Sequence, residues 1–151
     1  MNPILQMFRN YHLVCSLAGF LSAQVFKFIL TLIAAGTLDF KKLVENGGMP
    51  SSHTSTVLAL TVSLGRVLGT DSPVFAIAFI LSMVVMIDAM GVRRATGENS
   101  KLLNKIIHDL FEEKNAAFLA EDLREYVGHK PLEVLVGAVI GIIIPFIIAP
   151  F

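Results

Sequence analysis

Three long stretches of this chain carry almost no charge, and this pattern limits the fold more than any other feature. Residues 11–36, 73–92 and 132–151 each contain one charged residue, namely Lys27, Asp88 and Glu133. A helix needs about 20 mostly apolar residues to cross the roughly 30 Å hydrocarbon core of a bilayer. All three stretches reach that length, so the sequence predicts three membrane-spanning helices.

A fourth apolar stretch, residues 54–69, is slightly shorter, and its only charge is Arg66, near one end, where a long side chain can reach the interface. Backbone in lipid must satisfy its own hydrogen bonds, so all four spans are expected to be helices. The chain is 54% hydrophobic and 16% charged, whereas soluble domains are about 25% charged. We therefore expect one all-α domain over residues 1–151, a polytopic integral membrane bundle of about four helices. A soluble four-helix core is the alternative, but it leaves few residues for a polar surface.

The segment from Ser100 to Tyr126 is of a different kind, because it holds ten of the charged residues. Apolar residues recur in it at three- and four-residue spacing, which predicts an amphipathic helix at the membrane interface or against the bundle: Leu102, Leu103, Ile106, Ile107, Leu110 and Phe111. A second apolar seam follows at Leu119, Leu123 and Tyr126. A helix dedicated to a partner protein is the alternative. Gly97 predicts a turn between the third span and this helix.

Composition also excludes several classes of function. Twelve basic residues balance twelve acidic ones, so nothing in the composition favours nucleic-acid binding. The single cysteine, Cys15, cannot form an intrachain disulfide. We expect no cofactor and no metal ion.

Threading four spans through a bilayer brings the unusual polar residues to one membrane face. The loop before the second span, the end of the third span and the start of the fourth all lie on that side, and Lys27 lies below it in the first span. Most basic residues also gather there: Lys41, Lys42, Arg93, Arg94, Lys101, Lys105, Lys114, Arg124 and Lys130. The positive-inside rule then predicts a cell-membrane protein with this face in the cytoplasm and both termini outside.

Each of these residues has a chemical interpretation. Ser51 or Ser52 can cap the second helix, whose positive dipole end favours an anion. Arg93 and Arg94 present forked donors that match phosphate oxygens, although such a pair is often only a topology anchor. A buried Lys27 is costly unless it has a function. Asp88 could serve as support for the site or as a structural partner.

The start of the fourth span pairs a histidine with a carboxylate. His129 and Glu133 are four residues apart, so the carboxylate could orient the imidazole if both lie on one helix face. Pro131 suits the first turn of a helix. Gly137 and Gly141 continue the same face and predict close helix packing.

Together these motifs resemble the type 2 phosphatidic acid phosphatase superfamily, which also includes the vanadium haloperoxidases. Pro50-Ser51-Ser52-His53 resembles its P-S-G-H motif, and His129-x3-Glu133 is similar to its closing H-x3-D. The stretches GGMPSSHTS, DAMGVRRATG and GHKPLEVLVGA look like a divergent, short, membrane-embedded branch. The resemblance runs over about residues 24–141. The chain departs from the pattern in lacking the R-P of the first motif and in having Leu123 where the third motif has arginine.

The resemblance implies a set of roles at this face. His129 would attack phosphorus and form a phosphohistidine, with Glu133 orienting it, and His53 would act as general acid and base. The phosphate would be bound by five residues: Lys27, Ser51, Ser52, Arg93 and Arg94. The implied substrate is a lipid phosphate or diphosphate in the membrane, and a pair of chains could complete the bundle.

Two alternatives remain at this stage. One is a non-enzymatic binder or transporter of lipid phosphates or anions that keeps the pocket without turnover. The other is a metal-assisted hydrolase using His53, Asp88, His129 and Glu133, which ranks last because the adjacent arginines would repel a cation.

Overall fold

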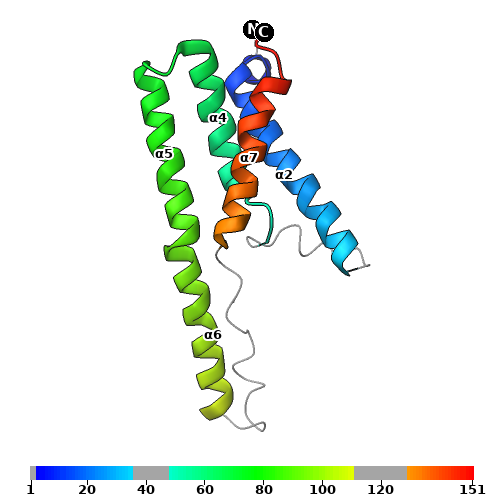
Figure 1. Ribbon diagram of the computed structural model, residues 1–151, viewed down its shortest axis with the longest axis vertical. Helices are drawn as coiled ribbons and strands as arrows, with labels where there is room; N and C mark the ends of the chain where they lie inside the picture. Colours follow the sequence, from blue (N-terminus) through cyan, green and yellow to red (C-terminus); the bar gives the residue numbers. More distant parts are fainter. Residues whose placement is uncertain (1–2, 36–47, 111–128) are drawn as a thin grey trace.

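The computed structural model describes residues 3–35, 48–110 and 129–151, and in this part of the chain every regular element is a helix (Figure 1). The helices follow one another in the order α1 (Pro3–Phe8), α2 (Tyr11–Ala35), α4 (Ser52–Leu68), α5 (Pro73–Met90), α6 (Val92–Leu110) and α7 (Pro131–Ile147). The predicted all-α fold is confirmed, and α2, α4, α5 and α7 coincide with the four predicted spans.

The helices differ in how well they match the thickness of a bilayer. Within the described residues, Tyr11–Ile33 of α2 and the continuous stretch Pro73–Ile107 are long and apolar enough to cross it. Helices α4 and α7 have 17 residues each, which at 1.5 Å per residue is about 25 Å. A helical membrane bundle therefore combines two long helices with two that are shorter than an average hydrocarbon core.

Helix α4 lies at the centre and packs against α2, α5 and α7 (Figure 1). Its hydroxyl groups bind neighbouring backbones: the Ser55 hydroxyl donates to the carbonyl of Gly19 in α2 at 2.8 Å. Thr61 Oγ1 lies 2.8 Å from Ser82 Oγ of α5, and it also donates to the Ala78 carbonyl at 3.0 Å. Helices in lipid gain little from apolar burial alone, so such hydrogen bonds and close packing hold them together.

Glycines let α4 approach its neighbours at backbone distance. A Cβ placed on Gly19 of α2 would lie 3.0 Å from both Ala59 Cβ and the Ser55 carbonyl. On α7, a Cβ on Gly141 would lie 2.5 Å from the Ser55 carbonyl, and one on Gly137 would collide with the carbonyl of Ser51. The close packing predicted for Gly137 and Gly141 is thus present, and α4 is the partner.

The two chain termini lie together at one end of the bundle (Figure 1). At this end the Tyr11 hydroxyl is shared between the carbonyls of Pro145 and Ile148, at 2.9 and 3.1 Å. Arg66 donates to the Tyr11 oxygen at 3.1 Å, and its guanidinium lies 4.7 Å from the centre of the Phe146 ring. These contacts tie α2, α4 and α7 together at the end opposite the predicted site.

Helix α6 continues in line with α5 and extends beyond the bundle (Figure 1). Only Gly91 separates the two helices, and the turn expected at Gly97 is wrong, because Gly97 lies inside α6. One glycine costs a helix only about 1 kcal/mol, which the flanking residues outweigh. The predicted amphipathic helix is present as far as Leu110, with Leu102 and Leu103 exposed on it, and Phe111 lies outside the described residues. The seam at Leu119, Leu123 and Tyr126 lies outside the described residues.

Candidate phosphate site

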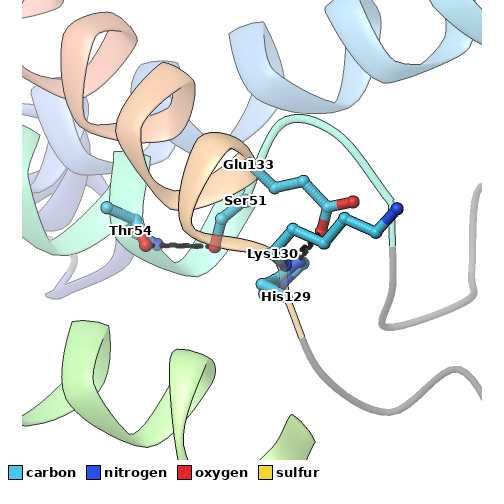
Figure 2. Close-up of polar contacts among 5 residues, drawn as sticks. All are labelled: Ser51, Thr54, His129, Lys130 and Glu133. Atoms are coloured by element: carbon cyan, nitrogen blue, oxygen red, sulfur yellow. Dashed lines mark hydrogen bonds and ion pairs between the residues drawn. The ribbon is translucent and has the colours of Figure 1, made fainter.

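The first turn of α7 builds the histidine–carboxylate pair. Lys130 is the N-cap, Pro131 is the first helical residue and Glu133 is the third. The Glu133 side chain reaches back, so that Oε2 accepts the Lys130 amide at 3.1 Å and His129 Nδ1 at 3.0 Å (Figure 2). The predicted pairing therefore exists, although His129 precedes the helix instead of belonging to it.

The pairing fixes which nitrogen of the imidazole acts as the donor. A carboxylate can only accept, so His129 donates from Nδ1, and Nε2 is the ring nitrogen that bears the lone pair in the neutral imidazole. His129 is 5% exposed, and its amide donates to the carbonyl of Ala89 near the end of α5 at 3.1 Å. Both the ring and the backbone of this histidine are therefore held by neighbours.

The loop leading into α4 is attached directly to the start of α7. The amide of Ser51 donates to the carbonyl of Glu133 at 2.9 Å. Ser51 is also the N-cap of α4, where its fully buried hydroxyl oxygen accepts the Thr54 amide at 3.4 Å and the Thr54 hydroxyl at 3.0 Å (Figure 2). The two motifs, far apart in sequence, thus share a backbone hydrogen bond.

Lys27 of α2 lies beside the same loop. It is 9% exposed, and a Cβ placed on Gly48 would be 3.3 Å from its Cε and 4.0 Å from its Nζ. Gly48 has φ of +91°, a conformation that glycine adopts readily and other residues avoid. Residues from α2, α4, α5 and α7 therefore meet at one end of the bundle, as the threading of the spans predicts.

Other predicted site residues are placed less centrally. Ser52 is the first residue of α4, and His53, next to it, is exposed. Asp88 is half-buried near the end of α5. Arg94 is on α6, where its Nε forms an ion pair with Glu98 Oε1 at 3.1 Å and both side chains are largely exposed. The side chain of Arg93 lies outside the described residues.

Comparison with known proteins finds similarity over nearly the whole chain. The family model described as "Divergent PAP2 family" matches residues 8–144. The chain belongs to this family. It is 36% identical over 156 aligned residues to the uncharacterized membrane protein YuiD of Bacillus subtilis (strain 168), with 97% of this chain and 99% of that protein covered. No solved structure matches the chain. The resemblance drawn from the motifs is confirmed at the level of the family.

The matched region of the divergent PAP2 family includes every element that forms the site. Sequence reasoning found both motifs but missed the contacts that join them: the Ala89 carbonyl and the amide of Ser51. Nothing in the sequence distinguishes the Ala89 carbonyl from others in α5. The role of Gly137 was signalled only by its spacing from Gly141.

The metal-dependent alternative needs a set of ligands. Among residues 3–35, 48–110 and 129–151, no three His, Cys, Asp or Glu side chains gather closely enough to hold a metal ion. The four residues considered for it, His53, Asp88, His129 and Glu133, do not form such a group there.

Proposed function

We propose that this protein is a membrane-embedded phosphatase that hydrolyses a lipid phosphate or diphosphate through a phosphohistidine at the cytoplasmic face. The observation that carries the proposal is the hydrogen bond from His129 Nδ1 to Glu133 Oε2, made beside Ser51, the N-cap of the helix that carries His53. It leaves Nε2 as the nucleophilic atom of an oriented imidazole.

The reaction has two steps. His129 Nε2 attacks phosphorus, the bond from phosphorus to the leaving oxygen breaks, and His53 as imidazolium gives that oxygen a proton. Water then attacks the phosphohistidine, His53 takes a proton from the water, and the phosphorus–nitrogen bond breaks. Inorganic phosphate is released, and His129 returns to its neutral state. Glu133 stabilises the positive charge that His129 carries between the two steps.

The electrostatics of this end favour a phosphate. Helices α4 and α7 both begin here, and the N-terminus of a helix carries about half a positive charge and free amides that favour anions. The buried Lys27 places its amino group, a donor to phosphate oxygens, next to the loop. We assign phosphate contacts to Lys27 and to Ser52 through its backbone amide, and charge neutralisation to Arg93 and Arg94.

The test is phosphate release from defined lipid phosphates by the purified protein in nanodiscs. His129→Asn is the sharpest variant, because the asparagine amide can still donate to Glu133 while the attacking nitrogen is lost. We expect release to fall on the order of 10³-fold or more at an unchanged unfolding temperature. Radiolabelled substrate should leave an acid-labile label on the wild type and none on the variant. Equal release by both proteins would disprove the mechanism.

A second candidate is a phosphate binder without turnover. Two observations favour it: the Ser51 hydroxyl is buried as a helix cap, and Arg94 pairs with Glu98 instead of with a residue of the two motifs. A binder would retain the affinity of the wild type for inorganic phosphate in His129→Asn and lose it in Lys27→Met. It would release no phosphate from any lipid phosphate.

A further inference from the structure

A backbone contact between α4 and α7 sets the distance between the two motifs of the site. Ser51 donates its amide to the carbonyl of Glu133 at 2.9 Å. The same residue, Glu133, holds His129 through its side chain. Glu133 of α7 therefore links the loop before α4 to the imidazole of His129, and it sets the distance between them.

This contact depends on the absence of a side chain at position 137. A Cβ on Gly137 would collide with the carbonyl oxygen of Ser51, and it would lie 3.2 Å from the Ser51 carbonyl carbon and amide nitrogen. All three are backbone atoms of a buried residue, so they cannot swing aside as the end of a flexible side chain could. Any side chain at 137 must push the loop and α7 apart.

We infer that Gly137 is a positioning residue for the proposed reaction: it holds the Ser51–His53 segment against α7, and this sets the positions of the general acid His53 and the phosphate-binding Ser52 amide relative to His129. The inference rests on the proposed function for its catalytic part only. Its structural part, that Gly137 maintains the hydrogen bond from Ser51 to Glu133, stands independently of turnover.

Gly141 offers a matched control on the same face of α7. A Cβ there would lie 2.5 Å from the Ser55 carbonyl and 3.0 Å from Leu58 Cβ, so Gly141→Ala introduces a clash of comparable size between α4 and α7. The contact lies one turn deeper in the bundle, however, where the Ser55 hydroxyl is anchored to Gly19 of α2. Gly141→Ala should strain the packing of the helices without moving the Ser51 loop.

The first measurement is hydrogen exchange of the Ser51 amide in the full-length protein in nanodiscs. We expect exchange to be at least about 10-fold faster in Gly137→Ala and unchanged within about 2-fold in Gly141→Ala. The second is the kinetics of phosphate release. Since a displacement of about 1 Å can cost on the order of 10²-fold, we expect kcat to fall by that factor in Gly137→Ala at a similar KM, and to stay within about 3-fold in Gly141→Ala.

Several outcomes would overturn the inference. Unchanged Ser51 exchange in Gly137→Ala would show that the glycine does not maintain the contact. Equal kcat values for the two variants would show that the contact does not position the reacting groups. If the wild type releases no phosphate in a His129-dependent way, the proposed function fails, and Ser51 exchange together with the affinity for inorganic phosphate then decides the role of Gly137.

A second pair of variants covers the case in which Gly137→Ala does not fold. Ser51 has φ of −72°, which proline can adopt. Ser51→Pro and Ser51→Ala both remove the capping hydroxyl, but only the proline also removes the amide that binds Glu133. We expect kcat of Ser51→Pro to be at least about 10-fold below that of Ser51→Ala. Equal values would overturn the inference.

Discussion

At the scale of single residues, Glu133 joins the parts of the site. Its side-chain Oε2 accepts from His129 and from the Lys130 amide, and its carbonyl accepts from Ser51. A glutamate at the third position of a helix commonly reaches back to the N-cap amide. Here the same reach orients a histidine that lies outside the helix, so one carboxylate both caps α7 and fixes the imidazole.

We predict that Glu133→Gln separates these two tasks. The amide oxygen can still accept the Lys130 amide, so the free energy of unfolding should change by about 1 kcal/mol or less. The negative charge that stabilises a positively charged His129 is lost, and phosphate release should fall about 10⁴-fold, as when a triad carboxylate becomes an amide. Phosphate release and thermal unfolding measured on the same preparation check this. A loss of activity no larger than the loss of folded protein would contradict it.

Gly48 is the second informative residue, and Gly69 is its matched control. Both have positive φ, +91° and +87°, so alanine at either position should destabilise the protein by about 1–3 kcal/mol. Only Gly48 has Lys27 beside it, since a methyl group added to Gly48 would lie 3.3 Å from Lys27 Cε. We expect Gly48→Ala to weaken inorganic phosphate binding about 10-fold and Gly69→Ala to leave it unchanged. Equal affinities, measured by titration calorimetry, would argue against a role of Lys27 at the phosphate.

At the scale of helices, the hydroxyl groups of α4 add hydrogen bonds to the close packing that holds the bundle together. Thr61 and Ser82 are both buried and bind each other across α4 and α5. We predict a coupling of about 0.6 kcal/mol between Thr61→Val and Ser82→Ala in a double-mutant cycle of unfolding in detergent, typical of such bonds in membranes. In the control cycle Thr31→Val takes the place of Thr61→Val, since the Thr31 hydroxyl donates to the Lys27 carbonyl of its own helix. Fully additive effects of the two substitutions would contradict the prediction.

The positions of the helices were predictable because they depend on local sequence. The near absence of charge over residues 73–92 predicts α5, and in the structure the Ser72 hydroxyl caps this helix by accepting the Phe75 amide at 3.1 Å. The continuation of α5 into α6 was not predicted, because Gly97 suggested a turn where the chain in fact stays helical. It depends on the cooperative extension of a helix, which a single glycine does not stop.

The candidate site was predictable in part for a related reason. Membrane topology alone brings His53, Lys27 and His129 to one end, and spacing alone pairs His129 with Glu133. The role of Ser51 as a buried cap and the ion pair of Arg94 with Glu98 depend on contacts between side chains that topology does not determine. The assignment of phosphate contacts to these two residues therefore stays a prediction.

At the scale of the whole molecule, the distribution of charge and the length of the α5–α6 rod both bear on orientation. Pro73–Ile107 spans 35 residues, or about 50 Å, which exceeds a hydrocarbon core of about 30 Å. The polar part of the rod must therefore lie outside the membrane on the side of the site. It carries Arg94, Lys101 and Lys105, whereas the other end of the described bundle carries Arg9 and Arg66.

We predict from this asymmetry that α6 and the site face the cytoplasm while the termini face outward. Met7 and Leu102 are 57% and 59% exposed at opposite ends, and the native Cys15 is buried, so it should not react. A membrane-impermeant maleimide should label Met7→Cys in intact cells, and it should label Leu102→Cys only after the membrane is opened. Leu102 lies about 18 Å beyond the end of α5. Labelling at this position therefore shows on which side of the membrane the site lies, but not how deep the bundle is embedded. Labelling of Leu102→Cys in intact cells would place the site outside, where the substrate would have to be a lipid phosphate of the outer leaflet.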